Sequence, residues 1–300
     1  MPQIQALAAT TGFFDGVHRG HVEVLQCLKT LAQQQHLPTA VITYAPHPQS
    51  VLHNEQTIPL LTPFDEKQTL LTAQGIDFLF VLPFTAALAQ CSTADFFAQY
   101  LVSQFAVRQL VVGHNQCFGS DRVNDFGRLQ NIGNSLHINL LRANKVQYEE
   151  AAVSSSRIRK AISEGNVAAA NAMLGYSYRL QGEVVQGKQN GRKIGFPTAN
   201  LQLAADKLLP PDGVYAVQAT LAGTRRSGMM NIGTNPTLGT TNPRSVEVHL
   251  FDFEQIIYGK TLSVDIITHL RREQKFASLE TLQAALEQDK QRALRVLKKA

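Results

Sequence analysis

The chain has 300 residues, of which 44% are hydrophobic and 17% charged, a balance that is typical of globular proteins and supplies apolar material for about two cores. No apolar run approaches the roughly 20 residues that a membrane helix needs, and three scattered cysteines, never spaced as Cys-x-x-Cys, argue against a disulfide framework or a structural zinc site. The net charge of +5 comes without the long basic runs and interleaved aromatic residues that mark nucleic-acid binders.

Starting at the amino terminus, Met1–Thr11 has no basic region followed by an apolar run. We therefore expect no secretion signal, a cytoplasmic location, and no nucleic-acid or membrane partner. The sequence does not indicate an oligomeric state.

Strand-like and helix-like segments alternate along the first half of the chain. We expect buried strands at Thr39–Tyr44, Phe78–Leu82, Leu110–Val112 and Leu136–Leu141. Helical apolar spacing spans Val22–Gln35 and the segment from Phe96 to Phe105, which Ser92 or Thr93 would cap. This alternation predicts an α/β domain with a parallel, Rossmann-like sheet that is covered on both faces, and ligands on such sheets bind beyond the carboxyl ends of the strands.

The second half has a different pattern, in which helical periodicity stops near Tyr176 and returns near Ser278. Between these points, turn residues separate strand-like runs at Leu180–Val185, Val214–Leu221, Ser227–Ile232, Val246–Phe251 and Leu262–Thr268. Short strands without intervening helices predict a small all-β barrel or sandwich, followed by an amphipathic helix from Leu279 to Leu297. We therefore divide the chain into domains at residues 1–177 and 178–300.

A glycine-rich segment, Gly12–His21, lies where a first strand would give way to the Val22–Gln35 helix. Glycine lets the backbone approach a ligand closely, and a helix start offers free N–H groups to phosphates. His18 and His21 are three positions apart, so their rings can point to one side of the turn and stabilise charge in phosphoryl transfer. A metal site is the alternative, but a third ligand is not evident nearby.

This segment resembles the signature G-x-F-D-G-x-H-x-G-H of the His-x-x-His nucleotidyltransferase superfamily. Such proteins carry a second signature, I-S-S-T-x-I-R, near the end of the domain, and Val153–Arg159 reads V-S-S-S-R-I-R. A serine-rich helix cap is the alternative interpretation. Its pairing with the first signature favours phosphate binding by Ser155, Ser156 and Arg159.

The second half contains another glycine-rich stretch, Gly187–Asn200, which has no Walker lysine context. Backbone amides of such a loop can cradle phosphates, and hydroxyl and amide oxygens can ligate Mg²⁺. Downstream, Val246–Asp252 alternates, so Glu247 and His249 share one face of a strand. Glu247 could orient a substrate hydroxyl or be an ordinary exposed glutamate on an edge strand, and the pattern alone favours neither.

Five segments of the second half resemble riboflavin kinases in the same order, namely Gly187–Asn200, Asn231–Thr237, the Glu247 strand, Tyr258–Lys260 and Leu270–Phe276. With the first site upstream, the whole chain resembles the bacterial bifunctional riboflavin kinase/FAD synthetase family. The resemblance implies that the barrel phosphorylates riboflavin with ATP to give FMN. The first domain would then transfer AMP from a second ATP to FMN, giving FAD and pyrophosphate.

The same resemblance implies roles for individual residues. In the first domain His18 and His21 would be catalytic, and the nucleotide would contact Gly12, Phe14, Asp15, Gly16, Gly20, Asn115, Ser155, Ser156 and Arg159. In the second, Glu247 would be the base, Thr198 and Asn200 would hold Mg²⁺ and ATP, and the nucleotide would also contact Gly187, Gly195 and Pro197. Flavin would contact His47, Pro48 and, from a mobile loop, Arg271.

Four residues of the first domain depart from the family pattern, namely Phe13, Ala45, His114 and Gln116. His114 and Gln116 motivate one alternative, a riboflavin kinase whose degenerate first domain acts only as a scaffold or binds flavin or nucleotide. A non-enzymatic flavin sensor is a second alternative, but it would typically carry a DNA-binding segment or lack Glu247. A third, another small-metabolite nucleotidyltransferase, would not need the barrel. Since the phosphate-handling residues are intact, we expect both activities.

Overall fold

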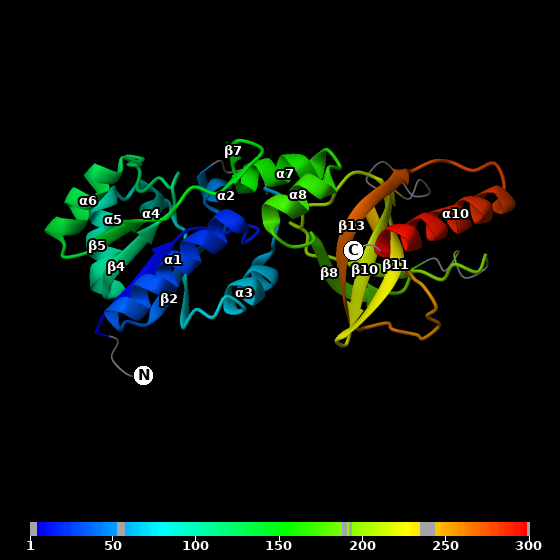
Figure 1. Cartoon of the computed structure of the whole chain (residues 1–300), viewed down its shortest axis with the longest axis horizontal. Helices are drawn as coiled ribbons and strands as arrows, with labels where there is room; N and C mark the ends of the chain where they lie inside the picture. Colours follow the sequence, from blue (N-terminus) through cyan, green and yellow to red (C-terminus); the bar gives the residue numbers. More distant parts are fainter. Residues whose placement is uncertain (1–4, 53–57, 188–190, 192–193, 235–243, 299–300) are drawn as a thin grey trace. The chain divides into compact units, whose positions relative to one another are not determined.

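The computed structural model describes residues 5–52, 58–187, 191, 194–234 and 244–298 (Figure 1). The chain folds into two compact units, Met1–Ser155 and Ser156–Ala300. This division groups helices α7 (Ser155–Ser163, apart from its first residue) and α8 (Val167–Leu174) with the second unit. The predicted boundary after residue 177, which concerns the two functional domains, stays a prediction.

The first unit is built on a five-stranded parallel sheet, which confirms the predicted α/β class. Its strands are β1 (Leu7–Thr11), β2 (Thr39–Ala45), β3 (Phe78–Pro83), β4 (Val107–Val112) and β5 (Asn139–Arg142). They lie in the order β3-β2-β1-β4-β5. The connections reverse direction between β1 and β4, and in open α/β sheets ligands bind at the carboxyl ends of the strands beside such a point.

Helices cover both faces of this sheet, as the alternation predicts. They are α1 (Arg19–Gln35), α2 (Pro48–Leu52), α3 (Phe64–Thr72), α4 (Ala86–Gln90), α5 (Thr93–Phe96), the π-helix η1 (Phe97–Gln104) and α6 (Phe126–Ser135). Successive strand residues face opposite sides, so Ala8 packs with Val24 and Leu28 of α1. Leu7 packs with Phe97 on the other face. A short hairpin, β6 (Gln147–Tyr148) and β7 (Ala151–Ala152), precedes α7.

The expected helix from Phe96 to Phe105 differs in form from the prediction. Ser92 caps α5 through a hydrogen bond from the Asp95 backbone N–H, as predicted. The chain then continues as the π-helix η1 up to Gln104.

The second unit is a closed six-stranded barrel in which every strand pairing is antiparallel. Its strands, in the order β10-β11-β12-β9-β8-β13, are β8 (Arg179–Val185), β9 (Ala199–Gln202), β10 (Gly213–Leu221), β11 (Thr224–Thr234), β12 (Arg244–Leu250) and β13 (Thr261–Arg272). Five of them were predicted, and β9 was interpreted as part of a loop. The barrel confirms the expected all-β class.

Helix α10 (Leu279–Leu297) closes the second unit, as its apolar spacing predicts. Ser278 and Thr281 form a capping box at its start. Ala293 and Leu297 pack against Val214 of the barrel. Among the residues that the structure describes, no helix is long and apolar enough to cross a membrane.

Candidate active sites

The two histidines of the first signature lie together at the start of α1. His18 is the N-cap residue, and its Nδ1 accepts a hydrogen bond from the His21 backbone N–H at 3.3 Å. The two rings stack with centroids 3.6 Å apart and planes 13° apart. Gly12 follows β1, and Gly20 lies in the first turn of α1. The predicted pair of imidazoles therefore stands where a helix attracts anions.

His21 is held in its neutral form by its surroundings. Burial lowers the pKa of His21 well below its usual value, and the nearby charges of His18 and Lys67 lower it further. Its buried Nδ1 has no hydrogen-bond partner among the described residues. A neutral ring with an unsatisfied nitrogen is suited to bind a phosphate oxygen by hydrogen bonding.

The loop between β1 and α1 is fastened by the Asp15 carboxylate, which is 2% exposed. Its oxygens accept hydrogen bonds from the backbone N–H groups of Leu61 at 3.1 Å and Thr62 at 3.0 Å. The Gly16 N–H in turn donates to the Thr62 hydroxyl at 2.9 Å. Phe14 and Gly16 both have positive φ, at 57° and 83°. The loop shape is thus well defined, while nucleotide contacts of Phe14, Asp15 and Gly16 stay predictions.

Gln116, one of the four departures from the family pattern, bridges the ends of β1 and β4. Its amide donates to the Thr11 carbonyl oxygen at 2.6 Å and accepts from the Gly113 N–H at 3.0 Å. The Thr11 hydroxyl lies 2.6 Å from the Tyr44 hydroxyl, and burial raises the pKa of Tyr44 to about 12. Gln116 therefore supports the sheet at the point where its strand order reverses.

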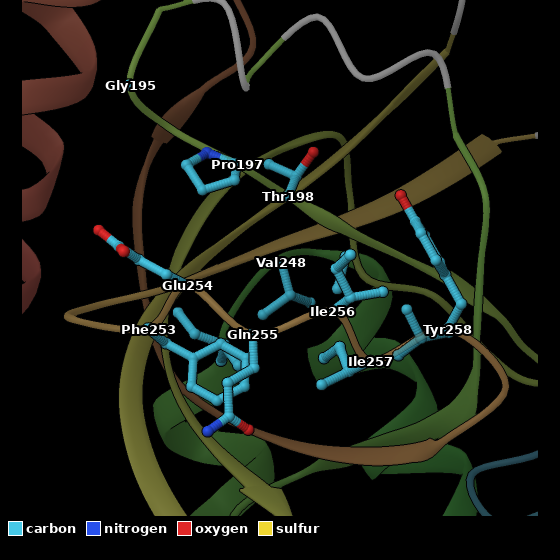
Figure 2. Close-up of a pocket in the computed structure, with 13 residues that line it drawn as sticks. Gly195, Pro197, Thr198, Val248, Phe253, Glu254, Gln255, Ile256, Ile257 and Tyr258 are labelled. Atoms are coloured by element: carbon cyan, nitrogen blue, oxygen red, sulfur yellow. The ribbon is translucent and has the colours of Figure 1, made fainter.

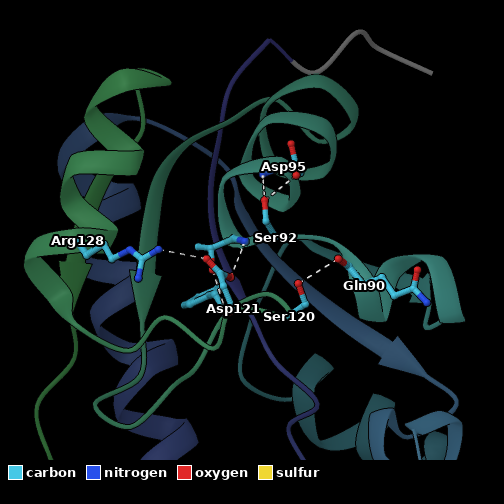
Figure 3. Close-up of polar contacts among 8 residues, drawn as sticks. Gln90, Ser92, Asp95, Ser120, Asp121 and Arg128 are labelled. Carbon is cyan, nitrogen blue, oxygen red and sulfur yellow. Dashed lines mark hydrogen bonds and ion pairs between the residues drawn. The ribbon is translucent and has the colours of Figure 1, made fainter.

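The loop that carries Asn115 is anchored by polar contacts further along (Figure 3). The Asp121 carboxylate accepts hydrogen bonds from the Thr93 backbone at 2.9 Å and the Thr93 hydroxyl at 2.7 Å. Ser120 donates to the Gln90 carbonyl oxygen at 3.0 Å. The side chain of Asn115 is exposed, so it can meet a ligand from a loop that is held at its far end.

Ser155, from the second signature, meets the first signature directly. It begins α7, and its hydroxyl donates to the Asp15 carbonyl oxygen at 2.8 Å. Ser156 and Arg159 follow on the same helix and belong to the second unit of the chain. Their phosphate contacts stay predictions.

The expected flavin residues of the first domain lie where β2 gives way to α2. The His47 ring packs edge-on against the Phe13 ring, with centroids 4.2 Å apart, and Pro48 begins α2. Lys67 of α3 lies over the same Phe13 ring, with its Nζ 3.9 Å from the centroid. Sequence reasoning missed Lys67, because a lysine in a polar helical segment gives no sign that it is buried.

The second site joins Thr198 to Glu247. The Thr198 hydroxyl donates to Glu247 Oε2 at 3.2 Å, and Glu247 pairs with Asn200 across β12 and β9. Since β12 lies between β11 and β9, the edge-strand interpretation of Glu247 is wrong. A side chain on Gly187 would meet Asn200, because an added Cβ would lie 2.1 Å from its amide nitrogen. The structure thus brings four predicted residues together.

A pocket of about 410 Å³ opens beside this group (Figure 2), within the size range of small-molecule sites. It is lined by the predicted residues Gly195, Pro197 and Thr198, and also by Val184, Ala199, Val248, Leu250, Phe253, Glu254, Gln255, Ile256, Ile257 and Tyr258. Of these, Ala199, Val248, Leu250 and Tyr258 belong to segments that sequence reasoning singled out, whereas Phe253–Ile257 do not. Residues 188–190, 192–193 and 235–237 of the predicted motifs lie outside the described residues.

His249 is a second residue whose role the sequence did not indicate. Its Nδ1 lies 2.8 Å from the Pro197 carbonyl oxygen, and its ring is 5.1 Å from the Phe196 ring. Burial lowers the pKa of His249, opposed by its hydrogen bond to Pro197. The side chain therefore fastens the segment that presents Thr198 to Glu247.

Arg271 does not lie in a loop, as was expected, but in strand β13. Its guanidinium pairs with Asp289 of α10, with Nη2 to Oδ2 at 2.8 Å. A buried carboxylate holds this side chain in place, and its flavin contact stays a prediction.

Comparisons with known proteins match both halves of the chain. A family model described as FAD synthetase matches residues 2–157, and one described as riboflavin kinase matches residues 174–297. The bifunctional riboflavin kinase/FMN adenylyltransferase of Bacillus subtilis is 36% identical over 289 residues, which cover 95% of this chain and 90% of that protein. The protein of the same name from Listeria monocytogenes is 37% identical over 281 residues, covering 93% and 89%.

A solved structure shares the fold over nearly the whole chain. A crystal structure described as a macrolide-efflux protein from Streptococcus pneumoniae aligns with a TM-score of 0.86 and 31% sequence identity. The alignment covers 97% of this chain and 94% of that one. Both units of the present chain therefore have counterparts in that single polypeptide.

Proposed function

The chain belongs to the bifunctional riboflavin kinase/FMN adenylyltransferases, and from this premise we propose which of its residues carry each reaction. The enzyme phosphorylates riboflavin to FMN and adenylylates FMN to FAD, with ATP as the donor. The comparisons give no support to a degenerate first domain. We also place the enzyme in the cytoplasm, where its three free cysteines would stay reduced.

Adenylyl transfer uses the start of α1. An FMN phosphate oxygen attacks the α-phosphorus of ATP, and the bond to the β-phosphate breaks to release pyrophosphate. His18 and His21 donate hydrogen bonds to the phosphate oxygens on which charge gathers. Their stacking and the dipole of α1 support this role. Ser155, whose hydroxyl is hydrogen-bonded to the Asp15 carbonyl oxygen, completes the phosphate site.

Riboflavin phosphorylation uses Glu247 and the adjoining pocket. Glu247 accepts the proton of the riboflavin 5′-hydroxyl as that oxygen attacks the γ-phosphorus of ATP. The pocket beside Pro197 and Thr198 receives the nucleotide. The contact between Thr198 and Glu247 carries this proposal, because it sets the expected base beside the expected phosphate loop.

The kinase site also suits Mg²⁺. The hydroxyl of Thr198 lies beside Glu247, and Asn200, which pairs with Glu247 across β9 and β12, adds an amide oxygen. Mg²⁺ in proteins often takes only one or two hard oxygen ligands together with substrate phosphates. We propose that Thr198 and Asn200 hold the ion. When bound, it would neutralise charge on the β- and γ-phosphates.

Two substitutions test the assignment in one assay. His21→Ala or Glu247→Ala protein is incubated with MgATP and either riboflavin or FMN, and the flavins are separated by chromatography. We expect His21→Ala to abolish FAD formation and spare FMN formation, and Glu247→Ala to do the reverse. Each variant is the control for the other. Unchanged FAD synthesis by His21→Ala would contradict the first site, and unchanged FMN synthesis by Glu247→Ala the second.

A further inference from the structure

Lys67 is a buried cation to which neither reaction has yet assigned a role. It lies on α3 and is 2% exposed. Its Nζ donates to the Phe13 carbonyl oxygen at 3.1 Å and to the Thr43 hydroxyl at 3.2 Å. Its ammonium also lies 3.9 Å from the centroid of the Phe13 ring. A lysine is rarely buried to this extent unless its charge is paired or has a function.

These contacts join three segments near the carboxyl ends of β1 and β2. Lys67 belongs to α3, Thr43 to β2, and Phe13 to the loop that leads into α1. The Thr43 hydroxyl also donates to the Phe13 carbonyl oxygen, at 3.2 Å, so this carbonyl is held from two sides. The next residue, Phe14, places its ring 5.0 Å from the His21 ring. Lys67 is therefore linked to the His21 ring through Phe13 and Phe14.

The charge of Lys67 acts on the same pair. Burial lowers the pKa of Lys67 to about 8, and the Asp15 carboxylate opposes this shift, so the side chain is largely an ammonium at neutral pH. The titratable groups that lower the pKa of His21 are His18 at the N-cap and Lys67 from α3. A positive charge thus stands beside His21, whose lowered pKa keeps its imidazole neutral.

We propose that Lys67 is a positioning residue for adenylyl transfer, which fixes the backbone at Phe13 and keeps a positive charge beside the His18–His21 pair, where the phosphates bind. The inference rests on the proposed function of that pair. In a buried site a positive charge stabilises a polyphosphate more strongly than one in water does, and the shape of the loop sets the direction of the imidazoles. Both effects favour the transition state.

The test compares Lys67→Met, which removes the charge and the hydrogen bonds, with Lys67→Gln, which keeps an N–H donor without the charge. Lys145→Met, at an exposed lysine of the same unit, is the matched control. We expect Lys67→Met to lower kcat for FAD synthesis about 100-fold, since misplaced reacting groups cost about that much. Lys67→Gln should lower kcat for FAD synthesis less than Lys67→Met does. FMN synthesis by the same molecules should not change, because the kinase site lies in the other unit of the chain.

A second measurement separates the charge from a merely structural effect. The His21 imidazole is followed by NMR against pH, with its signal assigned from its absence in His21→Ala. In both Lys67 variants we expect His21 to titrate at higher pH than in the parent protein, and in Lys145→Met at the same pH. FAD synthesis within twofold of the parent in Lys67→Met, or an unmoved His21 titration in both variants, would overturn the inference. Parent protein that makes no FAD would instead overturn the function of the site.

Discussion

The ion pair between Arg271 and Asp289 offers a quantitative test of how α10 is held on the barrel. The Asp289 side chain is 2% exposed, and Arg271 Nε and Nη2 donate to its Oδ2 at 2.9 and 2.8 Å. The perturbation is Asp289→Leu, which keeps the approximate size of the side chain and removes the charge. Arg271 would then be left as a largely buried cation without its carboxylate partner.

Removing one partner of a buried ion pair costs about 3 to 5 kcal/mol, because the remaining charge is not compensated. Since the Arg271 side chain is 17% exposed and can partly reach water, we take the lower end, about 3 kcal/mol. At 1.4 kcal/mol per factor of ten, this corresponds to roughly a 100-fold change in an opening equilibrium.

Hydrogen–deuterium exchange measured by mass spectrometry reports the opening equilibrium of each peptide separately. We expect peptides from α10 to exchange about 100-fold faster in Asp289→Leu, while peptides from α1, in the other unit, keep their rates. The double variant Arg271→Met/Asp289→Leu should recover most of the protection, because a buried pair can be replaced by apolar side chains at little cost. If α10 exchanged within threefold of the parent rate in Asp289→Leu, the pair would not hold the helix and the reasoning would be refuted.

Three further predictions concern the first unit. Gly119→Ala should destabilise it by about 2 kcal/mol in urea unfolding, because Gly119 has φ +64° and an added Cβ would lie 2.3 Å from the Thr93 nitrogen. Gln116→Leu should lower FAD synthesis about tenfold with FMN synthesis unchanged, because the Thr11 carbonyl oxygen loses its 2.6 Å bond; an equal loss of both activities would contradict this. Lastly, His21 has a lowered pKa in the folded chain, so the unfolded chain binds more protons below pH 6.5. The free energy of unfolding should therefore fall more steeply from about pH 7 to pH 5 in the parent than in His21→Asn, and equal slopes would contradict the burial of a neutral imidazole.

The fold was predictable wherever the chain repeats a simple spacing. The barrel strands and α10 follow from alternation and from helical apolar stripes, both of which report which face is buried. Strand β9 was missed because Ala199–Gln202 spans only four residues, and the first two end a motif that reads as a loop. The apolar spacing of Phe97–Gln104 predicts a helix but does not distinguish the π-helical form from the α-helical form.

The sites were predictable as motifs but not as contacts. The sequence placed His18 beside His21 because they share one turn, whereas the pairing of Thr198 with Glu247 needs the barrel to close. Arg271 was expected in a loop because the family resemblance implies one there, and the pairing of β13 with β10 shows that the strand continues to Arg272. Lys67 could not be found at all, because its burial depends on Phe13 and Thr43, which are distant in sequence.

The N-cap position of His18 also selects the kind of ligand that its ring can take. Because Nδ1 uses its lone pair to accept the His21 N–H, the neutral ring must carry its proton on Nε2. The tautomer is thus set by the helix backbone, and the Nε2 edge of the imidazole offers a proton instead of an electron pair. Such an edge repels a metal cation and attracts an oxyanion, so the local backbone converts a spacing that often serves zinc into one that serves phosphate.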